Sequence, residues 1–235
     1  MALYVLADLH LALGVNKPMD IFGGAWTGYA EKIKENLNVL QDDDILIIPG
    51  DVSWGLNLKQ ALADFKMLDA YPGKKYIVKG NHDLWWDTVT KMNRFFAEHE
   101  ITTIGFIYNN CVVYEHETLG KLALCGTRGW FFEEEKSGEH DEKMLNREVI
   151  RLRASLEAGK KENPDAIIAF LHYPPLYGNY DCAPIRKVLE EYNVSTCYYG
   201  HLHSESCRMA FQGVKNGVKY RLVSGDSVNF LPILI

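Results

Sequence analysis

The sequence predicts a mixed α/β protein with two sheets, and three observations support this fold class. The chain has 235 residues, of which 47% are hydrophobic and 24% charged, which is ordinary for a globular protein with a sizeable core. Between residues 1 and 100, strand-like apolar runs alternate with helical patterns, which favours βαβ units and a largely parallel sheet. Residues 101–126 hold short strands in succession without room for a helix, so we expect them to be antiparallel.

The expected strands are short apolar runs rich in Ile, Val and Tyr. They are Leu3–Leu9, Ile45–Pro49, Lys75–Val78, Ile101–Ile107, Val112–Tyr114, Leu122–Cys125, Ala166–Leu171, Thr196–Tyr199 and Val218–Val223. The expected helices have apolar residues at helical spacing. They are Tyr29–Leu40, Leu58–Asp69, Trp86–Glu98, Lys143–Lys160 and Pro184–Tyr192. No repeat or linker divides the chain, so we expect a single domain over residues 1–235, whose strand order the pattern leaves open.

Composition excludes several classes of protein. The formal net charge of −6 argues against a surface that grips nucleic acid through its phosphates. No apolar stretch is long enough to cross a membrane, and the start lacks the pattern of a secretion signal. The five cysteines are odd in number and contain no Cys-x-x-Cys pair, so we expect free thiols and a cytoplasmic protein. Oligomeric state is left open.

Polar side chains gather at the carboxyl ends of five expected strands. They are Asp8, His10, Asp51, Asn81, His82, Asp83, His172, His201 and His203. In open α/β sheets this edge is where ligands bind. The pairs Asp8/His10 and His201/His203 have i, i+2 spacing, so in extended backbone each pair would point to one face. A glycine precedes three of the sites, at Gly50, Gly80 and Gly200, where it permits a sharp turn and close backbone approach.

The set contains more ligands than one tetrahedral ion can use. Two carboxylates, one amide oxygen and four imidazoles suit two divalent ions that share a carboxylate. The alternative is that these are separately satisfied polar groups of the core. That alternative fits poorly, because five of the eight histidines fall at strand ends beside Asp and Asn. The other three, His99, His116 and His140, lie outside the pattern.

The order of these pieces resembles a known family. Residues 8–203 hold, in sequence, Asp-x-His, Gly-Asp, Gly-Asn-His-Asp, a single His and Gly-His-x-His. This series is similar to the five motifs of the calcineurin-like metallophosphoesterase superfamily. The segments Gly-Asp-Val-Ser-Trp-Gly (50–55) and Asn-His-Asp-Leu-Trp-Trp (81–86) further resemble a bacterial subgroup of predicted phosphohydrolases without an assigned substrate. The resemblance implies a four-layer α/β/β/α sandwich with two β-sheets face to face and helices outside.

The resemblance also implies roles for the residues. One ion would be held by Asp8, His10, Asp51 and His203, and the other by Asp51, Asn81, His172 and His201, with Asp51 bridging. His82 would be the general acid and Asp83 would orient it, while Asn81 and His82 would also contact the substrate. Imidazole and carboxylate ligands without thiolate suit Mn²⁺, Fe or Zn²⁺, and we favour Mn²⁺ or Fe.

The expected reaction is hydrolysis of a small phosphate ester by a hydroxide shared between the two ions, with His82 protonating the leaving oxygen. Ser53, Trp54 and Gly55 stand where Ser/Thr protein phosphatases carry Asp-Arg-Gly, so protein phosphatase activity is not expected. A phosphodiester or nucleotide-like substrate is favoured. The alternatives are a phosphomonoesterase acting on a small metabolite and a metal-binding scaffold without catalysis.

Several residues near the motifs are candidates for substrate selection. The long segment Leu11–Trp26 is either a lid or an ordinary connection. Trp54, Trp85 and Trp86 either stack a base or pack the core, and core packing is favoured. Arg128 either grips a phosphate or forms a surface ion pair.

Two further segments complete the prediction. The charge run over residues 133–142 is expected to be a solvated loop that leads into a helix. The apolar tail Phe230–Ile235 is expected either to cap a sheet or to pair with another subunit.

Overall fold

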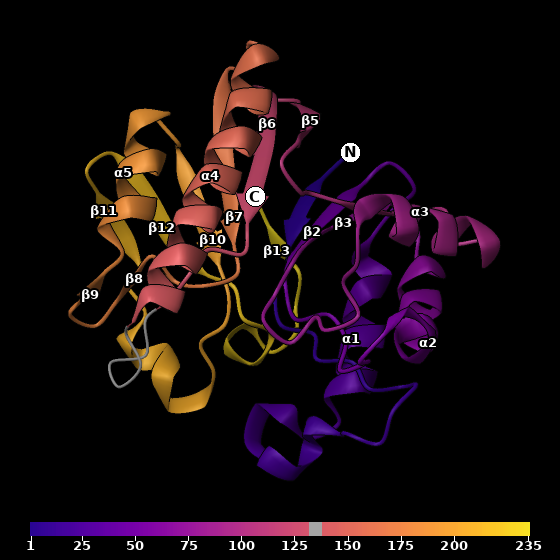
Figure 1. The fold of residues 1–235 in the computed structure, drawn as a ribbon. Helices are drawn as coiled ribbons and strands as arrows, with labels where there is room; N and C mark the ends of the chain where they lie inside the picture. The colour runs from indigo at the N-terminus through magenta and orange to yellow at the C-terminus, as the bar shows by residue number, and fades with distance from the viewer. Residues whose placement is uncertain (132–137) are drawn as a thin grey trace.

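The computed structural model describes residues 1–131 and 138–235, and its strands form two main sheets that pack face to face (Figure 1). The first sheet has the order β13-β1-β2-β3-β4. Its strands are β1 (Leu3–Val5), β2 (Ile45–Pro49), β3 (Lys74–Val78), β4 (Ile104–Phe106) and β13 (Ile233–Leu234). Strands β1 to β4 are parallel, and β13 joins β1 in the antiparallel direction.

The second sheet has the order β11-β12-β10-β7-β6-β5. Its strands are β5 (Cys111–His116), β6 (Gly120–Thr127), β7 (Ala166–Leu171), β10 (Thr196–Tyr199), β11 (Gly213–Lys215) and β12 (Val218–Leu222). Strands β6, β7, β10 and β12 are parallel to one another, and the edge strands β5 and β11 are antiparallel to their neighbours. A separate hairpin is formed by β8 (Leu176–Tyr177) and β9 (Tyr180–Asp181).

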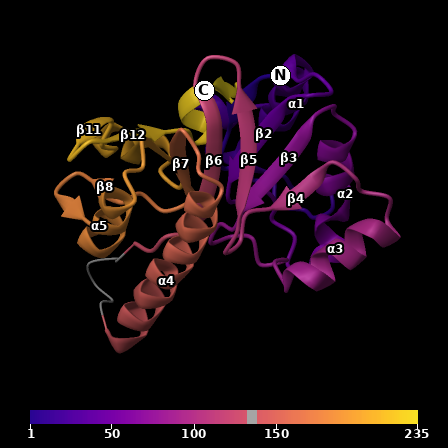
Figure 2. The ribbon, with the colours of Figure 1, turned by 90° about the horizontal axis from the view of Figure 1, so that it is seen from above.

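Helices cover the outer face of each sheet, as Figure 2 shows from above. On the first sheet lie α1 (Tyr29–Asn36), α2 (Leu58–Asp69) and α3 (Val89–Glu98), and on the second α4 (Glu139–Lys161) and α5 (Ala183–Glu191). Short 3₁₀ helices are η1 (Met19–Phe22), η2 (Gly24–Trp26), η3 (Leu37–Val39), η4 (Ser204–Met209) and η5 (Gly225–Val228). Side-chain caps explain where two helices begin, because Asn57 accepts from the Gln60 amide before α2 and Thr88 accepts from the Lys91 amide before α3.

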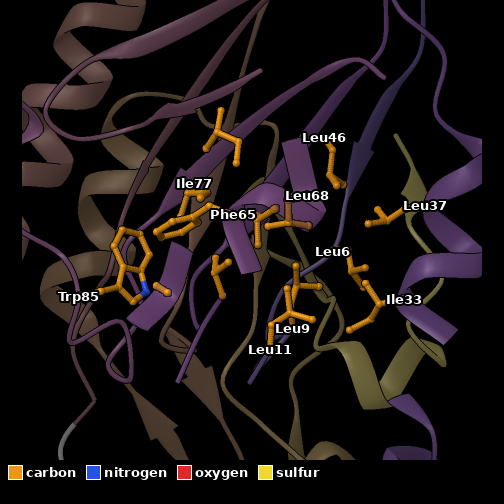
Figure 3. Packing of buried hydrophobic residues seen from close by; sticks show 14 of the residues in the cluster. Leu6, Leu9, Leu11, Ile33, Leu37, Leu46, Phe65, Leu68, Ile77 and Trp85 are labelled. Atoms are coloured by element: carbon orange, nitrogen blue, oxygen red, sulfur yellow. The ribbon is translucent and has the colours of Figure 1, made fainter. Parts of the chain in front are cut away.

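The alternation of side chains along the strands produces this layering. In β2, Leu46 and Ile48 pack toward the helices, whereas Ile45 and Ile47 face the other sheet. Figure 3 shows the helix side of the first sheet, where Leu46 lies in the same cluster as Phe65 and Leu68 of α2. Apolar burial on both faces therefore holds β2 in the centre of the molecule.

The second sheet alternates in the same way. In β7, Ile168 and Phe170 belong to the cluster between the sheets, and Ala169 and Leu171 pack under α4 and α5. The predicted α/β class with two mixed sheets is thus confirmed, and the four layers are those of the metallophosphoesterase sandwich.

One pairing prediction is wrong. Residues 101–126 do not form a single antiparallel unit, because β4 pairs in parallel with β3 of the first sheet. The reason is that α3 lies between β3 and β4 and serves as the crossover of another βαβ unit. The antiparallel expectation holds for β5 and β6, which form a hairpin in the second sheet.

The predicted element boundaries hold closely for most elements, and the larger differences have local causes. The first strand ends at Val5 rather than Leu9, because Asp8 and His10 leave the extended conformation. The tail caps a sheet, since β13 pairs with β1 at the edge. All five cysteines are free. Of the charge run, residues 133–137 lie outside the described part of the chain, and residues 139–142 form the first turn of α4.

Candidate metal centre

The candidate residues meet at the carboxyl ends of strands from both sheets. Asp8 and His10 follow β1, Asp51 follows β2, and His172 follows β7. The remaining members of the set follow β3 and β10; they are Asn81, His82, Asp83, His201 and His203. The backbone amide of Ala7 donates to the carbonyl of Val223, which joins the two sheets beside this edge. The site is therefore built where the two sheets meet.

Four of these residues have a left-handed backbone. The φ angles are 58° at Asp8, 45° at His10, 53° at Asp51 and 73° at His201. Such conformations cost about 1–3 kcal/mol at a residue other than glycine and persist where the surroundings enforce them, often at functional sites. The expectation that extended backbone aims each i, i+2 pair at one face is wrong, because these turned residues aim the side chains individually.

The three glycines before the motifs lie directly against the candidate ligands. A Cβ atom at Gly80 would overlap the carboxylate of Asp51, and one at Gly200 would overlap the carboxylate of Asp8. A Cβ atom at Gly50 would lie 2.6 Å from Nδ1 of His172, and its φ of 90° also favours glycine. The predicted close backbone approach is confirmed at all three positions.

In the buried carboxylates of Asp8 and Asp51, one oxygen accepts a hydrogen bond and the other accepts none from the described residues. Oδ2 of Asp8 accepts the His201 amide at 2.9 Å, and Oδ1 of Asp51 accepts the His82 amide at 2.8 Å. Oδ1 of Asp8 and Oδ2 of Asp51 are buried and have no hydrogen-bond partner among the residues described. An unpaired buried charge is costly, so these two oxygens fit a site for bound cations.

The unsatisfied oxygens face imidazole nitrogens at short range. Oδ2 of Asp51 lies 3.6 Å from Nε2 of His10 and 3.5 Å from Nε2 of His172. Oδ1 of Asp8 lies 3.7 Å from Nε2 of His203, which in turn lies 3.3 Å from Nε2 of His10. Two groups have all ligand atoms within 4.8 Å of one another: Asp8, His10 and His203, and Asp8, Asp51 and His172. This donor set fits a pair of divalent ions without thiolate ligands.

Hydrogen bonds to groups outside the candidate ligand set fix which ring nitrogen of His172 and of His203 faces the centre. Nδ1 of His172 lies 3.1 Å from the carbonyl of Pro49, and Nδ1 of His203 lies 2.9 Å from Oδ1 of Asp226. An N–H donated outward leaves the lone pair of Nε2 facing the centre, which is the usual arrangement of a metal-binding histidine. Asp226 is absent from the sequence prediction, although Gly225-Asp226 follows β12 as Gly50-Asp51 follows β2.

Burial disfavours the charged forms at the centre, which leaves buried imidazoles free to bind a cation but makes protons compete with the cation at the carboxylates. It raises the pKa of Asp8, with repulsion from Asp51 adding to the effect, and it raises the pKa of Asp51. It lowers the pKa of His172 to about 3 and of His201 to about 2, so both rings are neutral near pH 7. Burial also opposes the charged form of His203, but the hydrogen bond that its ring donates to Asp226 and the charge of Asp8 leave its pKa raised.

His201 and Asn81 reach the centre in different ways. The ring of His201 lies 5.1 Å from that of His172, but His201 is in neither of the two closest groups. Oδ1 of Asn81 lies 2.5 Å from Nε2 of His172. Both residues therefore border His172.

His82 stands at the opening of the centre, and its expected partner is elsewhere. Its ring is half-buried, 4.4 Å from the ring of Trp54 and 5.6 Å from that of His10, and burial lowers its pKa. The carboxylate of Asp83 accepts the amides of Asp51, Val52 and Gly80 and the indole N–H of Trp85. Since those donors fill both oxygens, the expectation that Asp83 orients the His82 ring is corrected. Asp83 instead positions the backbone of Asp51.

Arg128 is largely buried, and its ion-pair partner among the described residues is a buried carboxylate rather than a surface one. Its Nη2 lies 3.4 Å from Oε1 of the buried Glu148, and its side chain is 14% exposed. Its guanidinium lies 4.9 Å from the ring centroid of Trp130. Its positive charge acts on the centre electrostatically, because it partly offsets the burial that raises the pKa of Asp51 and adds to the burial that lowers the pKa of His172.

The tryptophans divide between core and site. Trp85 is buried in the first sheet's core cluster (Figure 3), as favoured by the prediction. The indole of Trp54 contacts two other residues at the site: Nζ of Lys17 is 3.3 Å from its ring centroid, and the centroid of the stacked His10 ring is 4.9 Å away. The segment that carries Lys17 also brings Trp26 against His10 and His203.

The fold and the paired carboxylate–imidazole groups define a metallophosphoesterase centre. The family model for calcineurin-like phosphoesterases matches residues 1–205, and the chain belongs to this family of metal-dependent hydrolases. Among solved structures it is similar to the phosphopantetheinyl hydrolase PptH from Mycobacterium tuberculosis, with 16% identity, a TM-score of 0.63 and coverage of 100% of this chain and 95% of that one. It is also similar to AQ665 from Aquifex aeolicus, a protein of unknown function, with 17% identity, a TM-score of 0.52 and coverage of 99% and 95%.

At these identities the likeness concerns the fold alone. No curated protein matches the chain significantly in sequence. Among the described helices, none is both long and apolar enough to span a membrane.

Proposed function

We propose that this protein hydrolyses a phosphodiester or nucleotide-like phosphate ester with two bound divalent ions. The observation that carries the proposal is a pair of buried oxygens, Oδ1 of Asp8 and Oδ2 of Asp51, which have no hydrogen-bond partner among the described residues and which face imidazole nitrogens. The phosphate-ester class of the substrate follows from family membership.

The side chains divide into two ligand sets. Asp8, His10 and His203 would hold one ion with Asp51, and Asp51 would hold the other with a second set, Asn81, His172 and His201. Oδ2 of Asp51 supports its bridging role, because it is nearly equidistant from Nε2 of His10 and Nε2 of His172. Nδ1 of His172 also lies 3.7 Å from Oδ1 of Asp8, but this nitrogen is hydrogen-bonded to the carbonyl of Pro49. We therefore do not assign Asp8 and His172 to the same ion.

When bound, the two ions supply a water of lowered pKa as nucleophile and neutralise the phosphoryl oxygens. The chain's own residues do the rest. His82, at the opening, donates a proton to the leaving oxygen, and its half-buried position beside Trp54 keeps the ring in place. Arg128 adds positive charge from the side of His172, which favours an anionic substrate. Imidazole and carboxylate donors suit Mn²⁺ or Fe, with Zn²⁺ as the alternative.

The test is hydrolysis by metal-loaded protein. With Mn²⁺ added, we expect turnover of bis(p-nitrophenyl) phosphate to exceed that of p-nitrophenyl phosphate. A strong preference for the monoester would replace the diester assignment with that of a phosphomonoesterase. Turnover at background level for both esters, with bound metal verified, would contradict the enzyme assignment for these substrates and favour a non-catalytic metal-binding scaffold.

A further inference from the structure

A cavity of about 340 Å³ opens beside the candidate centre. Three site residues, His10, His82 and His203, form its floor. Its other lining residues come from the loop after His10 and from the segment that follows β2: Lys17, Pro18, Met19, Ile21, Phe22 and Trp54. Its volume lies within the range of about 300–1,000 Å³ that is typical of small-ligand sites.

Apart from Lys17, the loop residues that line the cavity are apolar. Met19, Ile21 and Phe22 belong to η1, which lies in the indigo segment at the bottom of Figure 1, beyond the ends of the strands. Ile21 is 79% exposed and Phe22 is 65% exposed. One exposed apolar side chain is ordinary, but two consecutive ones at the rim of a cavity next to a reactive centre indicate a surface that a ligand covers.

The Trp54 ring of the lining is already engaged within the protein. Nζ of Lys17 lies 3.3 Å from its centroid, and the ring stacks on His10. The indole N–H of Trp54 is buried and has no partner within the described ranges, so it can donate to a ligand oxygen. Lys17 is the only Lys or Arg among the described residues of the lining.

We propose that this cavity, which we call the η1 pocket, holds the organic leaving group of the ester, and that this group is a hydrocarbon chain or ring. The inference rests on the proposed function. His82 lines the η1 pocket and is the residue placed to protonate the leaving oxygen, so the group attached to that oxygen must extend into the same space. The apolar wall then selects esters of hydrophobic alcohols or phenols over esters of polyols.

Binding tests the pocket separately from catalysis. Alkylphosphonates have a P–C bond that the enzyme does not hydrolyse, so their binding can be measured without turnover. The two probes, n-hexylphosphonate and 6-hydroxyhexylphosphonate, differ only in a hydroxyl group at the end of the chain. We expect the Mn²⁺-loaded protein to bind the hexyl compound at least about tenfold more tightly in calorimetry, because burial favours hydrocarbon. Equal affinities for the two compounds would overturn the proposal.

Substitutions locate the effect. Ile21→Ser and Phe22→Ser should each reduce the preference for the hexyl compound by about threefold to tenfold. Leu13→Ser is the matched control, because Leu13 is an exposed apolar residue of the same loop, 44% exposed, that does not line the η1 pocket. Metal content should be unchanged in all three variants. An equal loss of affinity for both phosphonates, or the same loss in the control, would contradict the assignment.

Hydrolysis of the corresponding hexyl and 6-hydroxyhexyl phosphate esters separates the two proposals. Turnover without a hexyl preference would refute the η1 pocket and leave the proposed function intact. Selective binding of hexylphosphonate without hydrolysis of any phosphate ester would refute the proposed function and leave the pocket intact.

Discussion

Asp226→Asn is the substitution that tests most sharply how the centre is assembled. Oδ1 of Asp226 lies 2.9 Å from Nδ1 of His203, and Oδ2 accepts the Ser204 amide at 2.8 Å. The Asp226 side chain is 4% exposed, so solvent screens its charge little. The carboxylate therefore holds the ring of His203 in the tautomer that leaves Nε2 free for a metal ion.

The magnitude follows from this geometry. An asparagine keeps the shape of the side chain but has a single acceptor oxygen, so it can accept only one of the two hydrogen bonds, and it lacks the negative charge that strengthens them. Loss of such an outer partner typically weakens metal binding by about tenfold to a hundredfold, which is about 1.4–2.8 kcal/mol. We expect this loss at the site that contains His203, and little change at the site that contains His172.

Calorimetric titration of metal-free protein with Mn²⁺ measures both sites. Asp87→Asn is a matched control, because Asp87 is an exposed carboxylate that pairs with Lys91 on the surface. The control should bind both ions as the wild type does. Unchanged affinity in Asp226→Asn, or an equal loss at both sites, would refute the role assigned to Asp226.

Four other predictions follow from the centre. Asp51→Asn should abolish binding of both ions, measured by metal analysis after gel filtration; two retained ions with normal turnover would show that Asp51 is not the bridge. Gly80→Ala should also lose metal, because its Cβ would displace the Asp51 carboxylate, and a full metal complement in a folded variant would contradict that reasoning. His82→Ala should keep its metal but turn over about 10²–10⁴-fold more slowly, and normal kcat would exclude His82 as the acid. Burial raises the pKa of Asp8 and Asp51, so protons compete with the metal ions for these carboxylates. Metal should therefore bind more weakly at about pH 6 than at about pH 8, and binding should release protons. A calorimetric metal affinity that does not change with pH would contradict this prediction.

Much of the site was predictable because its chemistry is local in sequence. Each candidate ligand directly follows an apolar strand, and Gly50, Gly80 and Gly200 mark the turns where backbone comes close to a carboxylate or an imidazole. Continuous apolar runs likewise predict β2 and β7, which are apolar on both faces. These signals need no knowledge of tertiary contacts.

The remaining features depend on contacts between distant segments. Asp226 has a local Gly-Asp signature, but its pairing with His203 becomes visible only once η5 is placed beside η4. Asp83 lies next to His82 in sequence, yet its oxygens are taken by amides that the fold brings from the loop after β2. The parallel pairing of β4 depends on α3 acting as a crossover, and the η1 pocket depends on where a segment without periodicity settles.

Anomalous diffraction from crystals grown with Mn²⁺ gives the most direct test of the metal centre. Two peaks are expected between the sheets, one against Nε2 of His10 and His203 and one against Nε2 of His172, with Oδ2 of Asp51 in contact with both. A single peak, or none among these side chains at full metal loading in solution, would contradict the assignment of a two-ion hydrolase.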